Sequence, residues 1–231
     1  IEFFPRLLPR QMDSAGAAIL RKQMEAMGFS LYLGAKTKEI IRESGRLFVV
    51  LESGEKIPAD MVLVSAGVRP EVTLAKSIGL EIDKGLKVDD TMKTAIDTIY
   101  AAGDVIEHRG IYYGIWPAAM EQGSIAGANM AGGHALYQGT VISNTLKVVG
   151  ISLSAAGDID SDGKLTAIIS KDDKKGIYRK FVIKDDILAG TILFGDSSGS
   201  TEIIEAVKNK KNIASLKNDI IRSDFDFTRL K

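Results

Sequence analysis

The sequence has 231 residues, of which 45% are hydrophobic, and its 30 basic residues are balanced by 30 acidic residues. This hydrophobic content is ample for a globular core, and the zero net charge argues against a nucleic-acid-binding surface, which usually shows a basic excess. The sequence contains no Cys, so a disulfide framework, a thiolate metal site and a redox CxxC motif are excluded within these residues.

The first predicted helix lies near the start of the chain. Asp13 or Ser14 can cap it, and Gly28 can end it after about Met27. Its apolar residues recur at spacings of three and four, which predicts a buried face formed by Ala17, Leu20, Met24 and Met27. Before this helix, a strand pattern ends at Glu2 with almost nothing preceding it, and no initiator Met is present. We therefore expect the chain to be a fragment of a longer protein.

Short strands and further helices are predicted next. A helix is expected over 71–79, and another from Pro117 to about Met130, because Pro is favoured in the first turn of a helix. The run "TIYAAG", residues 98–103, predicts a buried strand. Four earlier strands are predicted from apolar runs bounded by turn residues, at 29–33, 37–43, 46–52 and 56–66.

Beyond Gly139 the sequence pattern changes, so we place a domain boundary near residue 140. A helix is predicted over 200–208. Residues 158–163, "DIDSDG", follow the opening of a calcium-binding loop, but Ile169 stands where a bidentate Glu is required, so a hairpin turn is predicted instead. Apolar runs separated by charged turns predict an antiparallel meander with strands at 145–154, 164–170, 177–184 and 187–194.

Asp104 is the first candidate for a functional residue. It follows the predicted strand 98–103, and ligands bind at the carboxyl ends of strands in open α/β sheets. The small residues Ala102 and Gly103 allow a ligand to approach the backbone closely. The carboxylate could accept a hydrogen bond from a ligand hydroxyl, or it could simply end a strand or cap a turn. Local spacing does not decide between these two interpretations.

A family resemblance favours the first interpretation. Residues 94–104, "TAIDTIYAAGD", resemble the second flavin-binding motif of the FAD-dependent pyridine nucleotide-disulfide oxidoreductases. The resemblance implies that Gly103 and Asp104 lie at the FAD, and that Asp104 binds its ribitol chain.

Residues 60–72, "DMVLVSAGVRPEV", resemble the strand and glycine turn that lead from the NAD domain into the FAD domain of the same family. Ala66 and Glu71 depart from the Thr and Asn that are frequent there. The implied cofactor contact is therefore that of the backbone at Gly67.

A third segment, "GIWPAAMEQGSIAGANMAGG" at 114–133, is similar to the helix whose start meets the flavin ring in the NADH oxidase, nitrite reductase and rubredoxin reductase branch. The unpaired N–H groups of a helix start stabilise the negative charge of a reduced flavin, and Ala118 and Ala119 would present them. Trp116 could border the flavin or fill the core. Small residues recur every four positions and predict close helix packing, at Ala119, Gly123, Gly127 and Ala131.

Glu2 occupies the position where a Rossmann half places the acid that hydrogen-bonds the adenosine ribose, which would favour NADH over NADPH. Arg6 and Arg10 nearby could instead meet a phosphate. The glycine-rich GxGxxG loop that should precede such an acid is not present in the sequence.

These observations predict an α/β fold with partial Rossmann-type NAD and FAD domains, followed by an α+β C-terminal interface domain. Residues 1–67 are expected to be the C-terminal remainder of the NAD-binding domain. Residues 68–139 are expected to be the second part of the FAD-binding domain, and residues 140–231 an interface or dimerisation domain.

The resemblance implies a flavoprotein oxidoreductase that passes electrons from NAD(P)H through FAD to an acceptor such as oxygen, rubredoxin, a disulfide or nitrite. The alternative is a non-catalytic dimerisation or binding module with the same fold. We expect FAD and NADH as cofactors, a small-molecule or rubredoxin-like acceptor as partner, and a homodimer. No metal site is expected, because His108 and His134 are the only histidines. No apolar run approaches the roughly 18 residues that span a bilayer, and no signal peptide is present, so we expect a cytoplasmic location.

Overall fold

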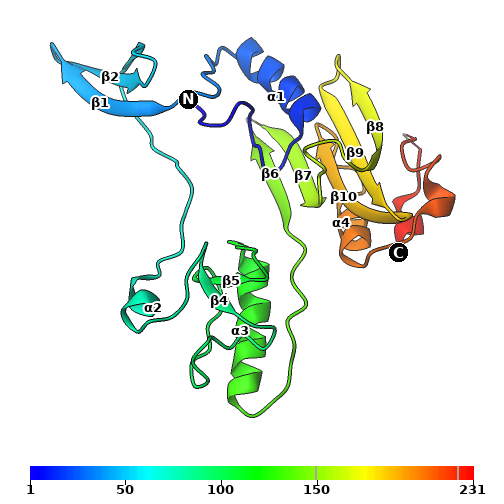
Figure 1. Ribbon diagram of the computed structural model, residues 1–231. Coiled ribbons are helices and arrows are strands. Elements are labelled where there is room, and N and C mark those ends of the chain that lie inside the picture. The colour runs from blue at the N-terminus through cyan, green and yellow to red at the C-terminus, as the bar shows by residue number, and fades with distance from the viewer. Residues whose placement is uncertain (149, 223) are drawn as a thin grey trace. The chain divides into compact units, whose positions relative to one another are not determined.

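The structure is a computed structural model that describes residues 1–148, 150–222 and 224–231 (Figure 1). The chain forms two compact units. The first unit combines residues 1–63 with residues 143–231, and the second consists of residues 64–142. Helices and strands occur in both units, which confirms the predicted α/β class. Among the described residues, no helix is both long and apolar enough to cross a membrane.

The largest element of the first unit is a five-stranded antiparallel sheet with the strand order β6-β7-β10-β9-β8. Two of its three inner strands, β9 and β10, are almost entirely buried and form the centre of the core. The predicted strands 164–170, 177–184 and 187–194 correspond to β8, β9 and β10, but the predicted single strand 145–154 is wrong, because it forms two paired strands, β6 and β7; Val149 lies outside the described residues. The predicted hairpin at 158–163 is wrong, because β7 and β8 do not pair. The strands are β6 (Ser143–Val148), β7 (Ile151–Gly157), β8 (Thr166–Asp172), β9 (Ile177–Lys184) and β10 (Ile187–Phe194).

Helix α1 (Ser14–Ala26) packs against this sheet. Asp13 caps it by accepting a hydrogen bond from the Gly16 N–H at 2.9 Å, as predicted. A Cβ at Gly16 would lie 3.0 Å from the Tyr178 ring, so glycine permits the close approach of α1 to β9. Met27 is 52% exposed, so its predicted burial is wrong. The helix ends at Ala26, and Gly28 lies shortly after it with a φ of +93°. The core that α1 shares with the five-stranded sheet consists of Met12, Ala17, Ile19, Leu20, Leu153, Ala155, Ile159, Tyr178, Ile192 and Phe194.

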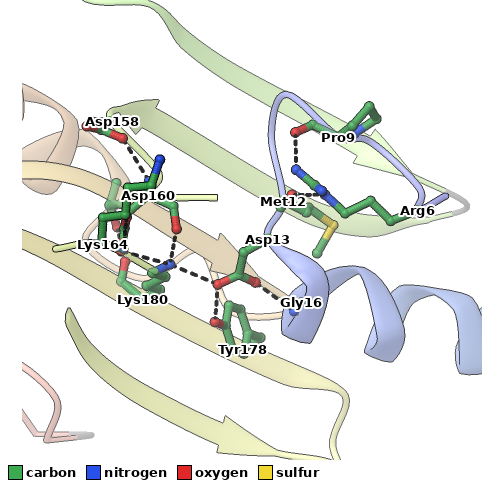
Figure 2. Close-up of polar contacts among 11 residues, drawn as sticks. Arg6, Pro9, Met12, Asp13, Gly16, Asp158, Asp160, Lys164, Tyr178 and Lys180 are labelled. Carbon is green, nitrogen blue, oxygen red and sulfur yellow. Dashed lines mark hydrogen bonds and ion pairs between the residues drawn. The ribbon is translucent and has the colours of Figure 1, made fainter. Parts of the chain in front are cut away.

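A buried polar network joins α1 to β9 and to the loop after β7 (Figure 2). The Lys180 ammonium donates to the Asp13 carboxylate at 3.0 Å and to the Asp160 backbone oxygen at 2.9 Å. The Tyr178 hydroxyl donates to the same Asp13 oxygen at 2.7 Å. Burial raises the pKa of Asp13, but hydrogen bonds from Gly16, Tyr178 and Lys180 outweigh it and hold that pKa below its ordinary value.

A separate three-stranded antiparallel sheet is formed by β1 (Thr37–Glu43), β2 (Arg46–Leu51) and β3 (Lys56–Ala59). The predicted strand 56–66 therefore ends at residue 59. Residues 61–72 pair with no strand and leave large apolar side chains exposed, because no neighbouring strand is available among the described residues. The predicted strand 29–33 is reduced to one parallel bridge between Leu33 and Glu2.

The first unit ends with α4 (Ser200–Lys208), as predicted, and with the short 3-10 helices η1 (Ala214–Leu216) and η2 (Phe227–Leu230). Helix α4 packs against β10, β7 and η2. Alternate residues of β9 point to opposite faces of the sheet, so Arg179 lies opposite Lys180. There its guanidinium stacks on Phe227, 5.0 Å from the ring centre.

The second unit contains α2 (Thr73–Ser77), β4 (Leu86–Val88), β5 (Ile106–His108) and α3 (Trp116–Met130), with β4 and β5 in parallel. Helix α3 begins and ends close to the predicted residues. The predicted strand 98–103 is wrong, because its backbone bonds locally. The Ala101 N–H donates to Met92 at 3.0 Å, and Ile99 accepts from Thr94 at 2.9 Å. The regular strand, β5, begins only after Asp104.

Candidate functional site

A tight turn at Gly103 and Asp104 is the centre of the candidate site. Gly103 has a φ of +83°, a left-handed conformation that glycine adopts without cost. The Ile106 N–H donates to the Gly103 oxygen at 3.1 Å and closes the turn directly before β5. A turn rather than a strand end therefore presents Asp104.

The Asp104 side chain is exposed. Within the described part of the chain it has no hydrogen-bond or ion-pair partner. Asp104 therefore does not cap the turn, which was the alternative role that its position in the sequence allowed. An ionised carboxylate only accepts hydrogen bonds, so these oxygens are available to hydroxyl or N–H donors of a ligand.

The backbone of the turn is attached to α3 by a buried side chain. The Gly103 N–H donates to Gln122 Oε1 at 2.9 Å, and Gln122 is only 1% exposed. Gln122 Nε2 in turn donates to the Tyr137 hydroxyl at 3.2 Å. A Cβ built at Gly103 would lie 3.6 Å from the Ala119 Cβ, so the turn also lies beside the first turns of α3.

The start of α3 has no side-chain cap, because Ile115 occupies the N-cap position and Pro117 follows in the first turn. The first N–H groups of a helix have no partner within the helix and carry partial positive charge. The Ala119 N–H, however, already donates to the Ile115 oxygen at 3.2 Å. The expectation that both Ala118 and Ala119 present free donors is therefore wrong for Ala119. The expected donors are the N–H groups of the first turn, up to Ala118.

Trp116 lies on the first turn of α3 with 77% of its surface exposed. It therefore does not fill the core of the described chain, and a contact with a ligand stays a prediction. Gly123 and Gly127 have no atom within 4 Å of an added Cβ, so the predicted close helix packing at these positions is not seen among the described residues.

Gly67 and Glu2 belong to different units of the structure. Gly67 has a φ of +78° in the exposed segment of the second unit that precedes α2. Glu2 belongs to the first unit, where its N–H donates to the Tyr32 oxygen at 2.8 Å and its carboxylate accepts from the Phe4 N–H at 2.8 Å. The guanidinium of Arg6 donates to the backbone oxygens of Pro9 and Met12, so it supports the loop before α1.

The second unit also contains a charged cluster, which lies at the end of β5. Asp90 accepts hydrogen bonds from the fully buried His108 Nε2 at 2.8 Å and from Arg109 Nε at 2.9 Å. The Arg109 guanidinium and the His108 ring together lower the pKa of Asp90 to about 2. His108 also packs against Tyr137, with 4.9 Å between the ring centres. This cluster fixes the end of β5 and is absent from the sequence predictions.

Gln122, Tyr137 and Asp90 were not predicted as site residues. Gln122 stands between Glu121 and Gly123 in the α3 sequence, and an amide on a helix is usually exposed. The only sequence signal is its position four residues after Ala118, which places both side chains on the same buried face.

Comparison with known proteins gives two family matches. Residues 1–123, just over half of the chain, match the family model of the pyridine nucleotide-disulphide oxidoreductases. Residues 143–211 match the model of the rubredoxin NAD+ reductase C-terminal domain.

Curated relatives support both matches. The chain is 34% identical over 215 residues to the nitrite reductase [NAD(P)H] of Bacillus subtilis, which covers 93% of this chain and 27% of that protein. It is 30% identical over 212 residues to the NADH-rubredoxin oxidoreductase of Clostridium acetobutylicum, covering 90% of this chain and 52% of that protein. The chain thus spans about a quarter to a half of the length of these relatives.

A solved structure shows the same fold. A ferredoxin reductase from Rhodopseudomonas palustris superposes with a TM-score of 0.81 at 22% identity, covering 99% of this chain and 57% of that one.

Proposed function

The chain belongs to the pyridine nucleotide-disulphide oxidoreductase family, and from this premise we propose that it is part of an FAD-dependent enzyme that oxidises NAD(P)H. A related structure of the family from Desulfovibrio vulgaris is described as FAD-dependent, at 24% identity. The observation that carries the proposal is the Gly103–Asp104 turn beside the uncapped start of α3.

The residues of this site suit a flavin cofactor. The exposed and unpartnered Asp104 carboxylate can accept hydrogen bonds from the hydroxyl groups of the ribitol chain. The partial positive charge of the first turn of α3, at Ala118, favours the negative charge that a flavin acquires when it is reduced. The exposed Trp116 can cover an aromatic ring edge. When bound, FAD supplies the hydride and electron transfer, and these residues orient it.

Glu2 and Gly67 complete the proposed cofactor contacts. One carboxylate oxygen of Glu2 accepts from Phe4, and the other remains able to accept from a ribose hydroxyl, which would favour NADH. Gly67, with its positive φ, would contribute its backbone. We also propose a division into NAD-binding (1–67), FAD-binding (68–139) and C-terminal interface (140–231) domains, with the last as a homodimer contact.

We propose a small electron-carrier protein as the acceptor. The match of residues 143–211 to the rubredoxin NAD+ reductase C-terminal domain and the similarity to an NADH-rubredoxin oxidoreductase support this choice. Oxygen, nitrite and a disulfide are the competing acceptors. A cytoplasmic location remains a prediction of the sequence.

The test is FAD binding by the full-length protein and by its Asp104→Ala variant. The purified wild-type protein should be yellow, and Asp104→Ala should bind FAD at least about tenfold more weakly, since hydrogen bonds to a charged group are lost. Asp97→Ala is the matched control, because Asp97 is a highly exposed carboxylate only seven positions away whose nearest cation is Lys93 at 3.9 Å. A colourless wild-type protein that binds no added FAD would contradict the proposal and would favour the non-catalytic module.

The 231-residue chain by itself provides a second test. It contains no GxGxxG loop to cradle a dinucleotide pyrophosphate, so it should bind FAD weakly and should not consume NADH. Steady NADH oxidation by these residues alone, measured by absorbance, would show that this account of the site is wrong.

A further inference from the structure

We infer that Gln122 is the positioning residue of the cofactor site. Its carboxamide fixes the Gly103–Asp104 turn against α3 and thereby sets the affinity for FAD. The inference rests on the proposed function. Because Gln122 is 1% exposed, it cannot itself be the main ligand contact, and it acts through the turn to which it is bonded.

The bond between Gln122 and Gly103 is a strong constraint on the turn. It joins residues 19 positions apart, and its acceptor Oε1 belongs to a buried side chain. Leaving a buried amide oxygen without a donor is costly, so the Gly103 N–H is held at this oxygen. Asp104 follows directly, and the direction of its backbone is therefore determined from α3.

The orientation of the Gln122 amide is fixed by a chain of hydrogen bonds that ends at a carboxylate. Thr140 Oγ1 donates to the Glu121 carboxylate at 2.6 Å, so the Thr140 oxygen accepts from the Tyr137 hydroxyl at 2.7 Å. The Tyr137 oxygen then accepts from Gln122 Nε2 at 3.2 Å, which leaves Oε1 for the Gly103 N–H. A flipped amide would place two donors against each other at Gly103.

Tyr137 anchors this series of hydrogen bonds within the core of the second unit. Its side chain is fully buried, with ring centres 4.9 Å from His108 and 5.7 Å from Tyr113. Its backbone N–H donates to the Asp90 oxygen at 2.7 Å. The hydrogen bonds thus tie the cofactor turn to the buried core of the second unit.

The experiment uses the full-length protein and compares Gln122→Leu with Asn129→Leu. Asn129 is the matched control, because it is a second buried amide of α3 with equally short bonds, to Thr91 and Ala135, near the other end of the helix. The dissociation constant of FAD is measured by fluorescence titration, and the exchange of the Gly103 amide hydrogen is measured in the FAD-free protein.

Gln122→Leu should weaken FAD binding roughly tenfold, the factor expected for one lost hydrogen bond of the site, and should accelerate exchange at Gly103. Asn129→Leu should change neither quantity. Tyr137→Phe, which removes only the hydroxyl that orients the amide, should weaken FAD binding about two- to fivefold and remains informative if Gln122→Leu does not fold.

Equal FAD affinities of Gln122→Leu and Asn129→Leu, or an unchanged Tyr137→Phe where Gln122→Leu does not fold, would overturn the positioning role and leave the proposed function intact. A wild-type protein that binds no FAD would overturn the proposed function, and this inference with it.

Discussion

The ammonium group of Lys180 lies 3.0 Å from the carboxylate of Asp13 in the interior of the first unit, although 167 positions separate the two residues in sequence. Asp160 provides a second carboxylate oxygen 3.9 Å from the same ammonium. The three side chains are each at most 10% exposed, so a single ammonium stabilises two carboxylates away from water.

We expect Lys180→Met to destabilise the first unit by about 3–5 kcal/mol, because it leaves two buried carboxylates without a cation. Glu25→Gln is the control. It removes an exposed pair with Arg21 at 2.7 Å and should change the free energy of unfolding by less than about 0.5 kcal/mol. Urea unfolding followed by far-UV circular dichroism measures both changes. Equal stabilities of the two variants would show that the buried pair does not stabilise the unit.

Asp90 should make the second unit sensitive to acid. Its pKa in the folded protein is lowered from 3.8 to about 2, so its contribution to stability is fully present above about pH 4 and is lost as the pH falls through about 2. Asp90→Asn should lower the unfolding midpoint near neutral pH and remove this acid-dependent step. Asp104→Asn, which changes an unpartnered carboxylate, should retain the step, and an identical acid profile for Asp90→Asn would contradict the assignment.

Gly103→Ala should cost about 1–2 kcal/mol, because the residue adopts a left-handed φ of +83°. The added Cβ would meet only ordinary contact with Ala119, so the cost would come from the backbone alone. Gly123→Ala is the matched control within α3, where open space and helix propensity should give a gain of about 0.5–1 kcal/mol. Thermal unfolding of the 231-residue chain compares the two variants, and a neutral Gly103→Ala would show that the turn relaxes.

Limited proteolysis should cut the chain first within residues 61–72. This segment has no regular structure, and Met61, Leu63 and Val64 are 71–89% exposed. A nonspecific protease followed by mass spectrometry locates the first cut. Early cleavage within β9 or β10, which are buried and paired on both sides, would contradict the fold described above.

The sequence predicted those elements that are specified locally. Helix α1 carries its own cap at Asp13, α3 carries Pro117 in its first turn, and both begin where these residues indicate. The run 98–103 was predicted as a strand because it is apolar. Its backbone instead bonds to the preceding loop at Met92 and Thr94, and periodicity alone does not distinguish these outcomes.

In the candidate site, too, the features carried by local motifs were predicted and those that depend on distant partners were not. Motif resemblance identified Asp104 and the start of α3, and the structure brings these two elements together through Gly103 and Gln122. The supporting role of Gln122 was missed, because it depends on partners at positions 103 and 137 that only the fold brings near. Likewise, the buried contact between Lys180 and Asp13 was not predicted, because only the fold brings together residues 167 positions apart.

The long separation between Asp13 and its partners on β9 has a consequence for the synthesis of this polypeptide. Helix α1 leaves the ribosome well before β9 and β10 have been translated, yet those strands supply Tyr178, Ile192 and Phe194 of the core that buries it. Until then, its apolar face and the Asp13 charge remain in water, and an isolated helix of 13 residues is only marginally stable. The first unit therefore cannot complete its core until β9 and β10 have been translated.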